Sequence, residues 1–384
     1  MEDWTLLLLG GFLLLALVGC WAAVRWRVTR GFGRPPVGLP LPPPLVGELR
    51  PNRLLADPLL LAEGVVRGPH SLLVEGDTIF AATADGAVLK LVGGDLRARL
   101  DVRHTDERRG TYASEPRVGR PLGLRRLNEE LVLVVDAYFG VFTADFRRGH
   151  LTPVFAAERE VDGRRCRFLN DLELLDGGLL VLSDSSATWQ RRDFALALVE
   201  CPADGRLLRV DTTSGTARVL LGGLRFPTGL QRHPDGESLL FAEAALFRVR
   251  RLWLTGERRG LVETFAENLP GLAANVRLSL QQTFYVALSA VRYRRRAGLA
   301  DRLDGRPLLR RLLLAFAPRP LLRAVAERAA ARGGLVLELD LFGHVVRAYH
   351  DPAGRCGVLA HASDDAAFLF IGGSRDFIAQ VPKE

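Results

Sequence analysis

Two short stretches of similar sequence carry side-chain oxygens at matching positions, as a loop that binds a hard cation requires. They are RFLNDLEL at residues 167–174 and RFPTGLQR at residues 225–232, with Asn-Asp at the tip of one and Thr-Gly at the tip of the other. An Asn-Asp turn before a strand also serves as ordinary turn chemistry, so a turn role and a ligand role both stay open for Asn170. The sequence has no Ser-His-Asp or Cys-His spacing that would mark a nucleophile.

The two loops belong to a unit that recurs along the chain, with the order turn, strand, turn, strand, acid. The copies are residues 77–94, 120–145, 167–186, 225–249, 269–290 and 357–381. Aligning the acids places Asp136, Asp184 and Glu243 in register, and a period of about 45–50 residues with several strands is typical of propeller blades. The sequence therefore predicts one all-β domain, a six-bladed β-propeller over residues 61–384, in which the two loops are inner loops of successive blades.

The acids of the repeat stand at strand ends, where carboxylates often accept hydrogen bonds from amides of an inner loop. Such a structural role is the main expectation for Asp136, Asp184 and Glu243. Because an inner loop faces the tunnel, Asp184 and Glu243 are also candidates to line the hub.

The N-terminus predicts a membrane anchor. Residues 5–24 contain no charged side chain, and about 20 apolar residues span a bilayer as a helix. We predict a single-pass anchor over residues 1–30, in the endoplasmic reticulum or plasma membrane, and a Pro-rich linker over residues 31–60. A cleaved signal peptide is the competing interpretation, but the Met-Glu-Asp start lacks the basic residues that such a peptide needs.

Membrane orientation stays open from the residues alone. Arg25, Arg27 and Arg30 follow the apolar segment, which by the positive-inside rule places the large domain in the cytosol.

One stretch breaks the β pattern. Residues 299–334 have helical periodicity, with Arg among Leu and Ala. They predict a helical insertion that either packs on the propeller or lies on a bilayer as a basic amphipathic helix.

The charge of the chain does not indicate a nucleic-acid partner. The net charge is +8 and comes almost wholly from arginine, because Lys90 and Lys383 are the two lysines. These arginines are scattered rather than clustered with aromatic residues, so we expect no nucleic-acid binding.

Several motifs resemble the animal strictosidine synthase-like proteins. They are FLNDLELLDGGLLVLSDSSATWQRRDF at residues 168–194, ADGAVLKL at 84–91, GRPLGL at 119–124, DGRLLRVDTTSG at 204–215, LRFPTGLQ at 224–231 and HDPAG at 350–354. The resemblance covers nearly the whole chain. It implies a membrane-anchored six-bladed propeller in a superfamily that includes paraoxonases, gluconolactonase-like lactonases and plant strictosidine synthase, and it favours a domain in the lumen.

The resemblance also implies a central calcium site, held in the hydrolytic members by Glu, Asn and Asp side chains. This sequence keeps two matching positions, Asn170 and Asn275. At three other ligand positions it has His70 where the family has Glu, Thr228 where it has Asn, and Ala274 where it has Asp. Leu122 stands in place of a paraoxonase histidine proposed as a base, and Ala360 in place of the catalytic glutamate of plant strictosidine synthase. Asp171 matches a ligand of a second, structural calcium, but its neighbour in that site is Ser71. A calcium cofactor held by Asn170 and Asn275 is thus a weak expectation.

Two functions remain in competition. The first is an arylesterase-type or lactonase-type hydrolase that acts on a small apolar ester or lactone, with His70 and Asn170 as catalytic residues and Thr228, Asn275, Asp184 and Glu243 lining the hub. The second is a non-catalytic propeller scaffold with a degenerate calcium site. Fold alone does not decide between them.

Overall fold

The structure is a computed structural model, which describes residues 18–19, 38–105 and 107–383. The predicted anchor therefore lies outside the described residues, apart from Val18 and Gly19, which are helical. Among the helices that are described, none has the length and apolarity needed to cross a membrane.

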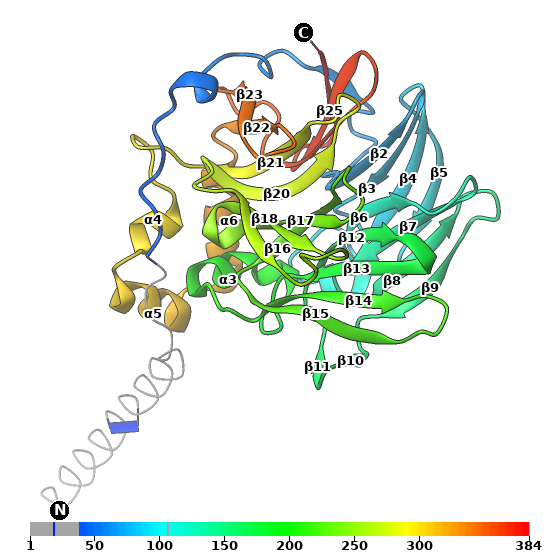
Figure 1. The fold of residues 1–384 in the computed structure, drawn as a ribbon, viewed down its shortest axis with the longest axis horizontal. Coiled ribbons are helices and arrows are strands. Elements are labelled where there is room, and N and C mark those ends of the chain that lie inside the picture. The colour runs from blue at the N-terminus through cyan, green and yellow to red at the C-terminus, as the bar shows by residue number, and fades with distance from the viewer. Residues whose placement is uncertain (1–17, 20–37, 106, 384) are drawn as a thin grey trace, which may run out of the picture.

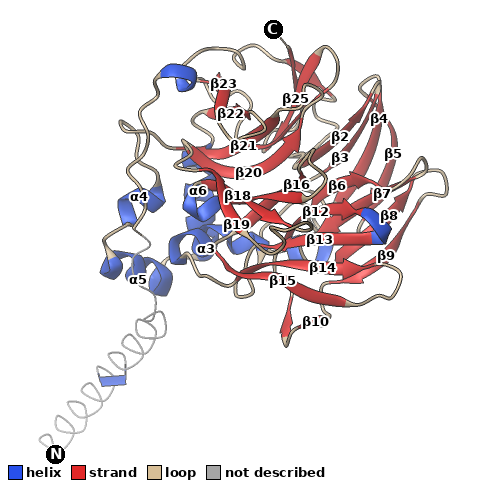
Figure 2. Cartoon of the chain, viewed as in Figure 1, coloured by secondary structure: helices blue, strands red, loops and turns tan. Residues whose placement is uncertain are grey.

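Six four-stranded antiparallel sheets make up the body of the molecule, which confirms the predicted six-bladed propeller (Figures 1 and 2). The first blade contains β2 (Ser71–Glu75), β3 (Thr78–Ala82), β4 (Ala87–Val92) and β5 (Asp95–Asp101). The second contains β6 (Pro121–Arg126), β7 (Leu131–Asp136), β8 (Gly140–Asp145) and β9 (His150–Ala156). The third contains β12 (Leu169–Leu175), β13 (Leu179–Asp184), β14 (Gly205–Asp211) and β15 (Ala217–Leu224).

The remaining blades follow the same order. The fourth contains β16 (Pro227–Arg232), β17 (Ser238–Glu243), β18 (Arg248–Trp253) and β19 (Val262–Ala266). The fifth contains β20 (Gly271–Leu278), β21 (Phe284–Val291), β22 (Gly334–Leu339) and β23 (Val345–Asp351). The sixth contains β24 (Leu359–Asp364), β25 (Phe368–Gly373), β26 (Ile378–Pro382) and, as its outermost strand, β1 (Leu59–Leu61).

The pairing of β1 with β26 closes the ring, because one blade takes strands from both ends of the propeller. The strand β1 begins inside the segment predicted as a linker. Upstream of it, Leu39 donates its backbone N–H to Asp304 at 3.0 Å, and Asn52 donates to the carbonyl of Ala348 at 2.6 Å. This part of the segment is therefore packed on the propeller rather than extended away from it.

Burial of the middle strands on both faces explains their unbroken apolar runs. Residues Leu133, Val134 and Val135 of β7 are all buried, as are Leu180, Val181 and Leu182 of β13. A strand covered on both sides by neighbouring blades has no polar face, so its sequence does not alternate.

Helices gather on one side of the propeller (Figures 1 and 2). The α-helices are α2 (Glu115–Val118), α3 (Phe194–Glu200), α4 (Leu299–Leu303), α5 (Pro307–Phe316) and α6 (Arg319–Ala330). Short elements complete the chain: η1 (Gly47–Leu49), η2 (Asp176–Gly178), η3 (Arg191–Asp193), η4 (Ala244–Leu246), β10 (Glu160–Val161) and β11 (Arg164–Arg165). Helices α4 to α6 fall in the stretch predicted as a helical insertion, between β21 and β22.

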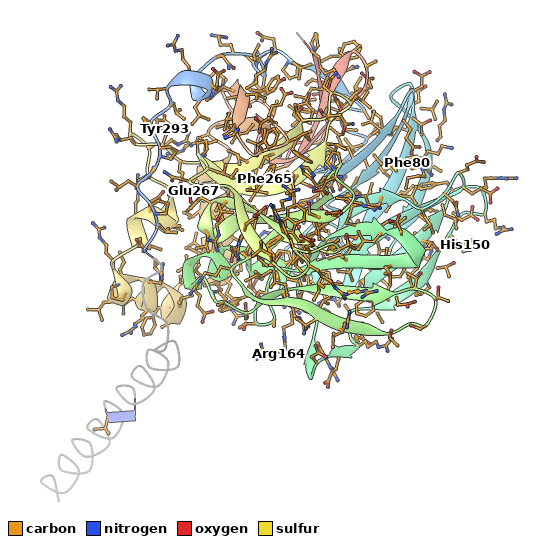
Figure 3. All side chains as sticks on the ribbon, viewed as in Figure 1. Phe80, His150, Arg164, Phe265, Glu267 and Tyr293 are labelled. Carbon is orange, nitrogen blue, oxygen red and sulfur yellow. The ribbon has the colours of Figure 1, made fainter. Side chains whose placement is uncertain are left out.

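Apolar packing holds the insertion against the propeller. Leu196 and Val199 of α3 form one buried cluster with Leu303 of α4 and Leu322 of α6. Tyr293 and Glu267 lie on this helical side, whereas Phe80 and His150 lie on the opposite side (Figure 3).

Candidate functional site

A cavity of about 910 Å³ lies where the six inner strands begin, beneath the helices. Each blade contributes at least one residue from the first part of its inner strand or from the position before it, including His70, Leu122, Asn170, Thr228, Ala274 and Ala360. In five of the six inner strands the pairing register shifts at this point. A bulge re-aims a side chain, so the repeated irregularity accounts for the orientation of the cavity residues in these five strands, whereas His70 precedes the regular strand β2.

Three predicted site residues thus meet in the cavity, namely His70, Asn170 and Thr228. Asn275 does not line it, because the register shift in β20 gives that position to Ala274. The Asn275 amide is buried one residue farther along, where its nitrogen lies 3.4 Å from Nδ1 of His361 and its oxygen accepts from the N–H of Val276 at 2.8 Å.

Asp184 and Glu243 do not line the cavity either. Asp184 accepts the N–H of Phe168 at 3.1 Å and pairs with Arg206 at 3.0 Å. Glu243 accepts the N–H of Arg225 at 2.8 Å and pairs with Arg248 at 2.6 Å. The hub-lining role proposed for both is therefore replaced by a structural one, in which each acid holds the backbone just before the inner strand of its own blade.

Below the cavity the hub is filled by a buried ion pair. The Arg277 guanidinium donates to both carboxylate oxygens of Asp171, at 2.8 and 3.0 Å. Arg125 lies 3.7 Å from the same carboxylate and 3.2 Å from Glu173. Although burial raises the pKa of Asp171, Arg277 and Arg125 outweigh it and lower the pKa. Positive charge from arginine thus neutralises the one acid of this layer that matched a calcium ligand.

Two glycines make room for this arrangement. A Cβ at Gly123 would lie 2.5 Å from Oδ1 of Asp171, and a Cβ at Gly229 would lie 2.5 Å from the backbone nitrogen of Val276. Neighbouring inner strands therefore approach closely enough here that a larger residue does not fit without displacement.

The donor set of the cavity does not fit calcium, which needs about 6–8 oxygen ligands. The Asn170 amide nitrogen donates to Ser185 at 3.0 Å, and the Thr228 hydroxyl donates to the carbonyl of Ala273 at 2.8 Å. The acids that line the cavity, Glu115 and Glu327, are both paired with arginine. Across the described part of the chain, no three His, Cys, Asp or Glu side chains are grouped so as to hold a metal.

The His70 ring is neutral in this setting. Its Nδ1 lies 3.0 Å from the carbonyl of Leu122, which accepts from the protonated nitrogen and leaves Nε2 as an acceptor. Burial, and then the charges of Arg120 and Arg191, lower the pKa of His70 to about 3. The ring can therefore accept a hydrogen bond from a ligand, but it is a weak base.

A basic cluster at the cavity wall went unpredicted. It consists of Arg120 before β6, Arg191 in η3 and Arg323 in α6, gathered around the buried Glu115 of α2. Arg191 and Arg323 bind the same oxygen of Glu115, at 3.1 and 2.9 Å. Glu115 and Arg120 belong to one stretch, but Arg191 and Arg323 come from two distant segments, so no local spacing in the sequence could have revealed the cluster.

Comparison with known proteins identifies relatives along most of the chain. A family model described as Strictosidine synthase matches residues 170–257. Adipocyte plasma membrane-associated protein of Gallus gallus is 34% identical over 349 residues, which cover 90% of this chain and 83% of that protein. The protein of the same name from Homo sapiens is 34% identical over 343 residues, 88% of this chain and 81% of the relative.

Solved structures share the fold at much lower sequence identity. A gluconolactonase from Xanthomonas campestris has a TM-score of 0.54 at 14% identity, covering 91% of this chain and 97% of the other. A calcium-binding regucalcin from Agrobacterium tumefaciens has a TM-score of 0.52 at 15% identity, covering 86% and 93%. At such identities the likeness concerns the fold alone.

Proposed function

Because the chain belongs to the strictosidine synthase-like family of adipocyte plasma membrane-associated proteins, we propose that it binds a small, largely apolar organic molecule in the hub cavity without a hub calcium ion. The observation that carries this proposal is the cavity itself, about 910 Å³ in volume. Pockets of about 300–1,000 Å³ are the usual size for small-molecule sites.

The lining supports an apolar ligand with a few polar contacts. Phe168, Phe226, Phe247, Leu198 and Val199 form part of the wall. At the floor, His70, Asn170 and Thr228 offer hydrogen-bonding groups that would orient a ligand. A predominantly apolar wall with a small number of placed polar groups is the general pattern of such sites.

Calorimetric titration of the full chain in phosphatidylcholine nanodiscs tests this function, with 1-decanol as the probe and empty nanodiscs as the blank. We expect saturable binding at one site. Ala274→Phe, which fills the cavity, is expected to abolish it, whereas Ala367→Phe at an exposed turn is the matched control and should bind as the parent does. Heat no greater than the blank, or equal binding by both variants, would overturn the proposal.

Ester or lactone hydrolysis is a second candidate, favoured by one observation. Arg120 and Arg191 place positive charge beside His70, and such charge would stabilise a developing oxyanion. The weakly basic His70 argues against an efficient proton acceptor. A panel of aryl esters and lactones separates the two functions: turnover that persists in EDTA and disappears in Asn170→Ala would establish hydrolysis, and a ligand-binding chain without turnover would exclude it.

We further propose that the helical side lies against an anionic membrane, in keeping with the membrane association named for the relatives. Helix α5 and the start of α6 carry exposed large apolar side chains and no acidic residue in their first turns. The exposed apolar side chains are Leu308, Leu309, Leu312, Phe316, Leu321 and Val325. Arg310 and Arg311 lie among them, and basic amphipathic helices of this kind bind anionic lipid surfaces.

Quenching by brominated lipid tests this contact in vesicles that contain phosphatidylserine. The fluorescence of the tryptophan introduced by Leu312→Trp is expected to be quenched more strongly than that of the tryptophan introduced by Leu280→Trp. Leu280 is more exposed to solvent than Leu312, at 64% against 49%, but it follows β20 at the end far from the cavity. Equal quenching at the two positions would contradict the membrane contact.

A further inference from the structure

Arg120 is a buried cation without a carboxylate partner. Its side chain lines the cavity with only 5% of its surface exposed. Both terminal nitrogens contact the carbonyl of Gly68, at the long distances of 3.3 and 3.4 Å, and Nε has no hydrogen-bond partner. Among the ion pairs of the described residues, none involves Arg120. A buried charge normally has a partner, so this guanidinium retains capacity to bind an anion.

The neighbouring groups do not supply the missing negative charge. The Glu115 carboxylate receives Arg191 and Arg323 on one oxygen and the Tyr138 hydroxyl on the other, at 2.7 Å. Although burial raises the pKa of Glu115, the surrounding arginines lower it to about 2, so the carboxylate is ionised. Glu327 pairs with Arg323 at 2.8 Å. Asp85 also attracts Arg120 electrostatically, but it forms its ion pair with Arg99, at 3.0 Å. Three arginines thus share the two carboxylates that are paired within the cluster.

The electrostatic state of Arg120 agrees with this imbalance. Burial, and then the charge of Arg191, lower the pKa of Arg120 to about 9, although Glu115 and Asp85 act in the opposite direction. At neutral pH the guanidinium is still charged. An anion beside it would relieve both the desolvation and the repulsion between the arginines.

We propose that Arg120, with Arg191 beside it, forms a subsite for the oxyanion head of an amphipathic ligand whose hydrocarbon part occupies the apolar wall of the cavity. The inference rests on the proposed binding function and names its ligand class. A planar guanidinium presents a fork of N–H donors that matches a carboxylate or a phosphate. The head would lie near Arg120, and the chain would extend along Phe226, Phe247 and Leu272.

Calorimetry with four matched ten-carbon probes tests the subsite, again with the full chain in phosphatidylcholine nanodiscs. The probes are decanoate, decyl phosphate, 1-decanol and decyltrimethylammonium. We expect at least one anionic probe to bind about tenfold or more tightly than 1-decanol, as a charge-assisted hydrogen bond permits. Decanoate and decyl phosphate distinguish a carboxylate ligand from a phosphate ligand.

Variants identify the group responsible. Arg120→Met is expected to remove the preference for the anion while 1-decanol still binds. If Arg120→Met does not fold, Arg191→Met replaces it, because Arg191 is only half-buried. This variant is expected to reduce the preference for the anion rather than to remove it. Arg97→Met changes the same residue type at an exposed site and is the control that keeps the preference.

The outcomes separate this inference from the function on which it rests. If no probe binds, the cavity is not a ligand site and both fail. If 1-decanol binds as tightly as the anions, if the preference survives in folded Arg120→Met, or if it is as large in folded Arg191→Met as in the parent, the anion subsite alone is refuted.

Discussion

Removing Arg277 is expected to destabilise the propeller strongly, because it leaves Asp171 charged and buried. Asp171 is 1% exposed, and its carboxylate receives two hydrogen bonds from Arg277, at 2.8 and 3.0 Å. In Arg277→Met the nearest remaining cation is Arg125, at 3.7 Å. Breaking a buried pair by removing one partner costs about 3–5 kcal/mol. Arg277 also donates to the carbonyls of Leu230 and Val276, so we expect the upper part of that range.

Urea unfolding followed by tryptophan fluorescence measures the loss. Asp171→Asn should cause a comparable loss by leaving Arg277 unpaired, whereas the double variant should recover part of it because neither charge remains alone. Arg232→Met is the matched control, since Arg232 binds Asp176 with the same two-bonded geometry at the surface, and its unfolding midpoint should stay close to the parent's. An unchanged midpoint in Arg277→Met, or no recovery in the double variant, would refute the reasoning.

Further expectations concern acid stability and close packing. The folded pKa of His70 is lowered to about 3 from 6.5, so between these values the unfolded chain binds more protons. His70 therefore stabilises the fold least at low pH, and its contribution to the free energy of unfolding falls by up to ~1.4 kcal/mol for each pH unit below 6.5. His70→Gln should reduce the difference between the urea unfolding midpoints at pH 7 and pH 5. The same difference in the variant and the parent would contradict this. Gly229→Ala should lower the free energy of unfolding by about 1–3 kcal/mol because the added methyl meets backbone at 2.5 Å. Gly222→Ala, whose methyl would meet Cγ1 of Val219 at an ordinary contact distance of 3.8 Å, should unfold near the parent's midpoint. Equal thermal midpoints for the two glycine variants would exclude a close approach at Gly229.

The blade architecture could be predicted from the sequence because its signals are local. Each blade repeats turns, apolar runs and an acid within about 50 residues, and a repeat of that period has few structural solutions. The acids at the ends of β7, β13 and β17 were recognised, but a strand-end acid suits both a tunnel wall and a backbone anchor. Only the structure shows that Asp184 and Glu243 bind the backbone before their own inner strands.

The candidate site was predictable only in part, because it depends on contacts between distant segments. Asn170 and Thr228 followed from the alignment of inner loops, and His70 followed from the resemblance to the strictosidine synthase-like proteins. Asp171 and Arg277, however, are 106 positions apart, and Glu115 and Arg323 are 208 positions apart. No periodicity links such residues, and the helical insertion that brings Arg323 to the cavity interrupts the repeat.

The most direct test of the account is the calcium dependence of ligand binding in the hub. The full chain in phosphatidylcholine nanodiscs would be titrated with 1-decanol, once in EDTA and once in excess calcium chloride. Because arginine neutralises Asp171 and the described residues form no group of acidic ligands for a metal, we expect the same affinity in both solutions. Binding that requires calcium, or calcium uptake by the parent that Asn170→Ala abolishes, would contradict it.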